Sequence, residues 1–97
     1  MIERHVSFQV HPGKEPEFER FFQTEYLPAM SAQAGFVRAE LLREVENLQV
    51  YQMCLRFVSV EAAASWRESA DHKRLSPTLK SLHTGSTVVV YRVIGPD

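Results

Sequence analysis

Cysteine and long apolar runs are scarce in this sequence, and each scarcity excludes a class of protein. Cys54 is the only cysteine among 97 residues, so one chain forms neither an internal disulfide nor a cysteine-based zinc site. The longest apolar runs, such as "TVVVY", are far too short to cross a bilayer. The first residues, "MIERHVSFQV", carry Glu3 and Arg4 and lack the apolar centre of a secretion signal. We therefore expect a cytoplasmic protein without membrane association.

An excess of charge of one sign is also missing. Eleven basic residues oppose twelve acidic ones, which gives a net charge of −1. Nucleic-acid binding relies on a basic excess, and the segment "LQVYQMCLRF" lacks the basic and aromatic signature of an RNA-binding sheet, so no nucleic-acid partner is expected. The four histidines follow no metal-binding spacing, so no metal site is expected either. The composition leaves a small-molecule site open.

What is present is an ordinary globular composition, 44% apolar and 24% charged, in a chain that fits one domain over residues 1–97. Alternating apolar and polar residues predict strands at 2–10, 36–45 and 48–58, the last two joined by a turn around Glu46–Asn47. A β-branched run after Gly85 predicts a fourth strand.

Helical spacing appears in the segments between these strands. Apolar residues recur every three or four positions from Glu17 to Gln33, where Pro28 predicts a kink or a broken last turn. Residues 59–70 predict a short helix, and residues 71–82 predict another one capped by Asp71.

The order strand, helix, strand, strand, helix, strand is typical of the ferredoxin-like α+β sandwich with a four-stranded antiparallel sheet. Helices cover only one face of such a sheet. The other face carries apolar side chains, namely Leu48, Val50, Cys54 and either Val88 and Val90 or Val89 and Val93. An apolar second face favours a homodimer that packs sheet to sheet into an α+β barrel.

A polar set alternates with the apolar positions of the first and third strands. His5, Ser7 and Gln9 share one side of the first strand, and Gln52 and Arg56 share one side of the third. Between two sheets of a dimer, they would form a hydrogen-bonded network. On the helix side they would form a binding site, and the sequence leaves both interpretations open.

Three segments carry a resemblance to a known family. They are "VHPGKEPEFERFF", "LPAMSAQAGFVRAELLRE" and "YQMCLRFVSVEAAASWRESADHK", and the spacing Trp66-x-x-Ser69-x-x-His72 is the most specific part. In this order they resemble the antibiotic biosynthesis monooxygenase (ABM) domain family of dimeric α+β barrels. Some members are cofactor-independent oxygenases that convert hydroxylated aromatic polyketides to quinones, and others open haem. The resemblance implies a site between the sheet and the helices.

Only some of the functional residues of the family have a match in this sequence. The polyketide oxygenases have an asparagine and a tryptophan on the third strand, at positions that Met53 and Phe57 occupy here. Trp66 matches a tryptophan of the haem-degrading members, whose asparagine and axial histidine fall near Val6 and Ser76. Haem degradation is therefore not favoured.

The segment "SWRESADHKRL" supplies the candidate catalytic residues. His72 lies in the first turn of a predicted helix, where the dipole favours the neutral imidazole that a general base requires, although Asp71 opposes this effect. Trp66 would wall the site, and Ser69 would bind substrate. The structural alternatives are a core tryptophan, a histidine that bonds a helix end and a serine that closes a helix.

Met53, Phe57 and Tyr26 complete the expected substrate-binding set. The function that this set favours is a cofactor-independent monooxygenase, with neither metal nor flavin, acting on a small apolar hydroxylated aromatic or quinol. The alternative is a dimeric ligand-binding or stress-related barrel without turnover.

Overall fold

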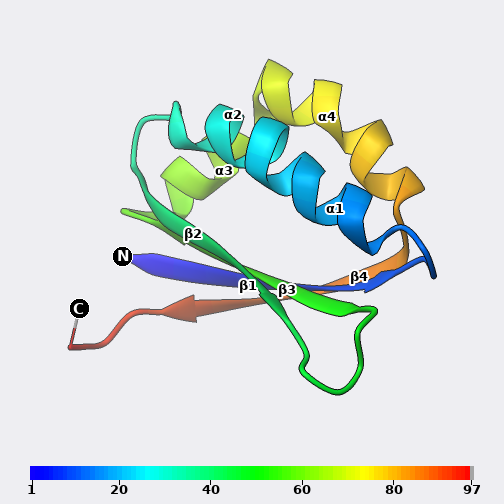
Figure 1. Cartoon of the computed structure of the whole chain (residues 1–97). Helices are drawn as coiled ribbons and strands as arrows, with labels where there is room; N and C mark the ends of the chain where they lie inside the picture. Colours follow the sequence, from blue (N-terminus) through cyan, green and yellow to red (C-terminus); the bar gives the residue numbers. More distant parts are fainter. Residues whose placement is uncertain (97) are drawn as a thin grey trace.

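The chain is described by a computed structural model that covers residues 1–96, in which one antiparallel sheet lies under a layer of helices (Figure 1). The elements along the chain are β1 (Ile2–Val10), α1 (Glu15–Phe21), the π-helical turn η1 (Phe22–Tyr26), α2 (Leu27–Ser31), β2 (Phe36–Arg43), β3 (Val50–Phe57), α3 (Val60–Glu68), α4 (Ala70–Ser81) and β4 (His83–Arg92). The strand order is β2-β3-β1-β4, which confirms the predicted ferredoxin-like α+β fold.

The core lies between the helix layer and one face of the sheet. Alternate residues of β3 point into it, and Tyr51, Met53, Leu55 and Phe57 are each at most 2% exposed. These side chains share a face because successive residues of a strand point to opposite sides. The helices contribute large apolar residues from the opposite side, namely Phe18, Phe21, Phe22, Tyr26, Met30, Trp66, Leu75 and Leu79.

The first helical segment runs from Glu15 to Ser31 without the break predicted near Pro28. A π-helical turn precedes the proline, and the N–H of Leu27 donates to the carbonyl of Phe22, five residues earlier. Proline lacks an N–H, and its ring clashes with the carbonyl four residues before it in an ordinary helix. The wider turn accommodates Pro28 and keeps the helix continuous. The predicted broken last turn is therefore wrong, and the irregularity next to the proline is a π-helical turn.

Serine residues cap both later helices. Ser59 Oγ accepts a hydrogen bond from the N–H of Ala62 at 3.1 Å and begins α3. The N-cap of α4 is Ser69 and not Asp71, since Ser69 has an extended backbone and its Oγ accepts from the N–H of His72 at 3.1 Å. Asp71 lies inside the first turn, where its carboxylate pairs with Arg74 at 3.2 Å.

The sheet face away from the helices carries the polar set of the first and third strands. His5 lies opposite Cys54 on β3 and Val89 on β4, so Val89 belongs to this face. Val88 and Val90 point to the other side, where they border a hollow with Ala63 of α3. Leu48 lies in the loop between β2 and β3, outside the strands.

The polar set on this open face forms a bonded network. Arg56 Nη2 lies 2.6 Å from Glu3 Oε1, and His5 Nε2 lies 2.7 Å from Glu3 Oε2. Gln52 Nε2 lies 3.1 Å from His5 Nδ1, and Ser7 Oγ donates to Gln52 Oε1 at 3.4 Å. The hydrogen bond from His5 is the main reason that the pKa of Glu3 lies below its usual value, and Arg56 lowers it further. The network interpretation agrees with this geometry.

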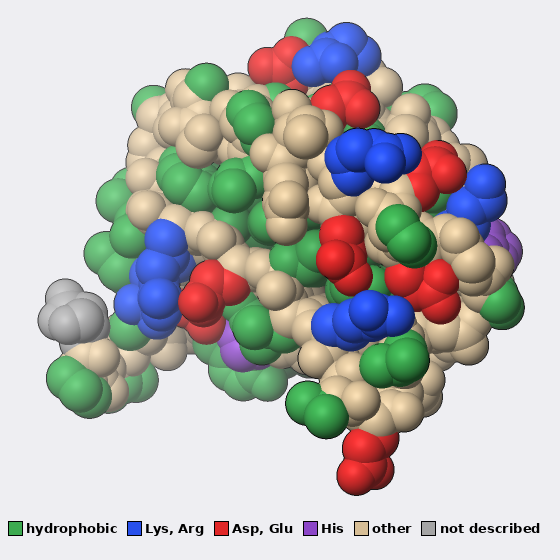
Figure 2. Space-filling model, in the orientation of Figure 1, with side chains coloured by type: hydrophobic (Ala, Val, Ile, Leu, Met, Phe, Trp, Pro, Cys, Tyr) green, Lys and Arg blue, Asp and Glu red, His purple; other side chains and the backbone are tan. Residues whose placement is uncertain are grey.

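Basic and acidic side chains are interspersed over the face shown in Figure 2, and neither sign forms a block there. Among residues 1–96, no helix is both long and apolar enough to span a membrane.

Candidate functional site

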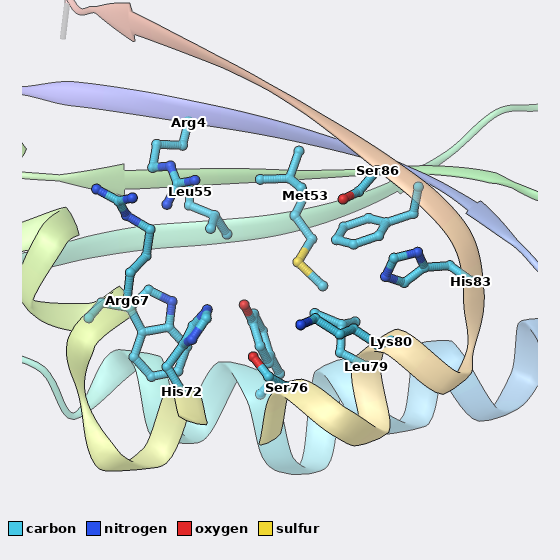
Figure 3. Close-up of a pocket in the computed structure, with 14 residues that line it drawn as sticks. Arg4, Met53, Leu55, Arg67, His72, Ser76, Leu79, Lys80, His83 and Ser86 are labelled. Carbon is cyan, nitrogen blue, oxygen red and sulfur yellow. The ribbon is translucent and has the colours of Figure 1, made fainter. Parts of the chain in front are cut away.

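A cavity of about 240 Å³ lies between the sheet and the helix layer (Figure 3). Strands β1 and β3 form one wall with apolar side chains, and the helices form the opposite wall with aromatic ones. The lining residues are Arg4, Val6, Phe8, Tyr26, Met53, Leu55, Trp66, Arg67, His72, Ser76, Leu79, Lys80, His83 and Ser86. This is the side of the sheet on which the family resemblance places a site.

Four of the six predicted site residues line this cavity: Tyr26, Met53, Trp66 and His72. Phe57 does not line it. It is fully buried nearer the end of β3, where its ring packs edge-on against Phe36 at 5.9 Å between centroids.

Ser69 also lies outside the lining, but it connects two residues that belong to it. Its Oγ donates to the carbonyl of Trp66 at 2.7 Å and accepts from the N–H of His72 at 3.1 Å. One hydroxyl thus bonds the last turn of α3 and the first turn of α4. The spacing Trp66-x-x-Ser69-x-x-His72 therefore brings an indole and an imidazole to the same cavity.

The aromatic rings on the helix side pack mostly edge to face. The centroids of Trp66 and His72 lie 5.2 Å apart at an interplanar angle of 87°, and those of Tyr26 and Trp66 lie 5.4 Å apart at 82°. Edge-to-face contact is a favourable arrangement for such rings. Trp66 is only 1% exposed, so it is both a core residue and a wall of the cavity.

His72 is held in its neutral form at neutral pH. Burial is the main cause that lowers the pKa of His72 below its ordinary value, and the charges of Arg4, Arg67 and Lys80 lower it further. Burial also raises the pKa of Tyr26, so its hydroxyl stays protonated. The site thus offers one group that accepts a proton and one that donates a hydrogen bond.

Sequence reasoning missed several residues of the cavity. Arg4 lies on the inward side of β1 and lines the cavity. A charged residue that alternates in phase with Ile2, Val6 and Phe8 was the sequence signal for a cavity on this side of the strand. Arg67 and Lys80 come from helix positions that helical spacing alone assigns to solvent.

His83 begins β4 and is half-buried at one end of the cavity. Its ring meets Phe8 edge-on at 4.9 Å between centroids. Its Nδ1 is buried and has no hydrogen-bond partner within residues 1–96. Only the β1–β4 pairing brings it to the site, and no local pattern predicts that pairing.

Two of the three residues that the haem-degrading members use are missing from this cavity. Val6 and Ser76 both line the cavity, and the resemblance implies that the asparagine and the axial histidine of the haem-degrading members fall near these two residues. Neither side chain supplies an imidazole ligand or an amide. Within residues 1–96, no three His, Cys, Asp or Glu side chains are grouped so that they could hold a metal ion.

Comparison with known proteins gives the family. A family model described as antibiotic biosynthesis monooxygenase matches residues 1–77. The chain belongs to this family. No protein in the curated set that was searched matches this ABM chain.

Solved structures of similar fold agree with the ABM assignment. SnoaB, a cofactor-independent oxygenase from Streptomyces nogalater, superposes with a TM-score of 0.88 at 24% identity, over 98% of this chain and 94% of that one. A conserved protein from Methanosarcina mazei Go1 has a TM-score of 0.85 at 20% identity, over 94% of this chain and 90% of that one. At these identities, the superpositions show that the fold is shared.

Proposed function

We propose that the protein is a cofactor-independent monooxygenase that acts on a small apolar hydroxylated aromatic or quinol-type molecule. The observation that carries the proposal is the neutral imidazole of His72 beside the apolar side chains of the cavity, in a chain of the ABM family. Met53 and Leu55 would contact the ring of the substrate from the sheet side, and Trp66 from the helix side.

The proposed reaction uses the substrate itself as the reductant. His72 removes a proton from a phenolic or enolic hydroxyl, and the resulting anion donates electrons to dioxygen. A new C–O bond forms at a ring carbon that carries a hydrogen, and the protonated His72 returns its proton to give a hydroperoxide. The O–O bond then breaks as the same carbon loses its hydrogen, which leaves a carbonyl. One oxygen atom stays in the product, and the other leaves as water. The apolar side chains of the cavity would limit side reactions by keeping bulk water away from the anion.

A ligand-binding barrel without turnover is the second candidate. The observation that favours it is Met53, which is buried at a position where the resemblance implies an amide in the polyketide oxygenases. The methionine thioether is at most a weak hydrogen-bond acceptor, and it donates no hydrogen bond to a substrate. The cavity would then bind an apolar molecule without activating it. In either case, the cytoplasm stays the predicted location.

Oxygen consumption separates the two candidates. Purified protein would be mixed with a panel of hydroquinones, anthrones and hydroxynaphthalenes in an oxygen-electrode cell, and quinone formation would be followed by absorbance. We expect uptake above the rate of autoxidation, with one quinone formed per dioxygen consumed. Tight binding of panel members without uptake would favour the non-catalytic barrel.

We further propose that two copies of the chain pair through the open sheet face. This face exposes Val89 and Tyr91, which are 50% and 48% exposed, beside the bonded network around Glu3. A network whose members already bond one another loses little when a partner covers it, because few polar groups lose a hydrogen bond. The family resemblance implies the same mode of pairing.

Val89→Asp is expected to convert this dimer into a monomer, because a carboxylate on each copy would be buried without a partner. Analytical ultracentrifugation at micromolar concentration would measure the change. Val45→Asp is the matched control, since Val45 lies in the β2–β3 loop and is 91% exposed. A wild-type monomer, or a Val89→Asp dimer, would contradict the proposed interface.

A further inference from the structure

The charged side chains that line the cavity are all basic. Arg4, Arg67 and Lys80 belong to the lining, and no Asp or Glu among residues 1–96 does. The whole chain carries slightly more acidic than basic residues, so this local excess does not follow from composition. A cavity lined with one sign of charge attracts ligands of the opposite sign.

Arg4 and Arg67 form the stronger part of this excess. Figure 3 shows both guanidinium groups at the same end of the cavity, whereas Lys80 lies away from them beside Leu79. Arg4 is half-buried on β1, and Arg67 reaches it from α3. Burial lowers the pKa of Arg4, and the charge of Arg67 lowers it further, as expected for neighbouring like charges.

No protein group within residues 1–96 neutralises this pair. Neither arginine has an ion pair or a side-chain hydrogen bond there, although Arg38, Arg43, Arg56 and Arg74 all pair with carboxylates. Two guanidinium groups at the same end of a cavity, with no carboxylate paired to either, repel each other. An oxyanion between them would relieve the repulsion and accept two-pronged hydrogen bonds.

We propose that Arg4 and Arg67 bind an oxyanion group, a carboxylate or a phosphate, on the molecule that occupies the cavity. This inference rests on the proposed function for the identity of the ring, and it adds a charged substituent to the substrate class. The ring contacts Met53, Leu55 and Trp66, and the anion sits at the arginine end.

Calorimetric titration of three related ligands tests the proposal. The ligands are 1-naphthol, 1-hydroxy-2-naphthoate and 1-naphthyl phosphate, which share a ring system and differ in charge. We expect the wild-type protein to bind at least one of the two anions about tenfold or more tightly than 1-naphthol. The preferred anion then identifies the group as a carboxylate or a phosphate.

Arg67→Gln is expected to remove this preference for the anion over 1-naphthol, and Arg67→Lys to restore part of it. Arg67 is exposed, so neither change disturbs the core. Arg20→Gln is the charge-matched control, because Arg20 is an exposed residue of α1 outside the cavity. Arg20→Gln should keep the preference for the anion.

Three results would overturn the proposal: equal binding of all three ligands, binding of neither anion, or an equal loss in Arg20→Gln and Arg67→Gln. None of the titrations needs the ligand to react with dioxygen. A charge preference without oxygen uptake would therefore support the proposed oxyanion site and contradict the proposed oxygenase activity. Oxygen uptake without a charge preference would support the proposed oxygenase and overturn the proposed oxyanion site.

Discussion

His72→Ala is expected to lower the rate of oxygen uptake by about 10²–10⁴-fold, because a positioned general base contributes a factor of this size. The rate would be measured with the best substrate of the panel at saturating concentration. His11→Ala is the matched control, since His11 lies in the loop before α1 and does not line the cavity. Uptake that His72→Ala leaves unchanged would keep the enzyme and exclude His72 as its base.

The pH profile of the wild-type enzyme gives an independent check on the same residue. A base acts in its neutral form, and burial together with Arg4 and Arg67 holds the pKa of His72 below 6.5. The rate should therefore rise with pH and reach its plateau at a pH lower than an ordinary histidine would give. Arg67→Gln removes one of the charges that lower this pKa, so it should move the rising limb to higher pH.

Gly35→Ala is expected to lower the free energy of unfolding by about 2–5 kcal/mol, through a left-handed backbone and a steric clash. Gly35 has φ +83°, and an added Cβ would lie 2.6 Å from the Cβ of Ala62 and 3.0 Å from Cγ2 of Val58. The carbonyl of Gly35 also accepts from the N–H of Val58 at 2.8 Å, so the loop cannot move away freely. Urea denaturation followed by circular dichroism would measure the loss.

Two other glycines separate the two contributions. Gly13 has φ +85° but nothing within 4 Å of an added Cβ, so Gly13→Ala should cost only the backbone part, about 1–2 kcal/mol. Gly85 has open space and no positive φ, so Gly85→Ala should change stability little. If Gly35→Ala costs no more than Gly13→Ala, the close contact with Ala62 does not constrain the fold.

The sequence predicted the strands well because their pattern is local. Alternation in residues 2–10 and 48–58 identifies the inward side chains directly, and the structure buries Phe8, Val10 and Tyr51 as that pattern requires. The cap of α4 was predicted two residues late, since Asp71 and Ser69 are both good N-cap residues. Only the backbone geometry, with Ser69 extended, decides between them.

Only part of the candidate site could be predicted, because a local pattern identifies only residues that lie close together in the sequence. Trp66 and His72 lie close in the sequence, and Ser69 links them locally, so a short motif identifies them. Arg4 and His83 come from strands at opposite ends of the chain, and only the β1–β4 pairing brings them to one cavity. Long-range pairing of this kind has no signature in a local pattern.

The π-helical turn before Pro28 has a consequence for how relatives align with this chain. Each residue advances an α-helix by about 100°, so one residue fewer between Phe22 and Tyr26 would change the face that Tyr26 presents. A homologue that lacks this extra residue should have a gap there, an ordinary helix and a different side chain against Trp66. Homologues of the family could therefore be grouped by the length of this turn as well as by the identity of its residues.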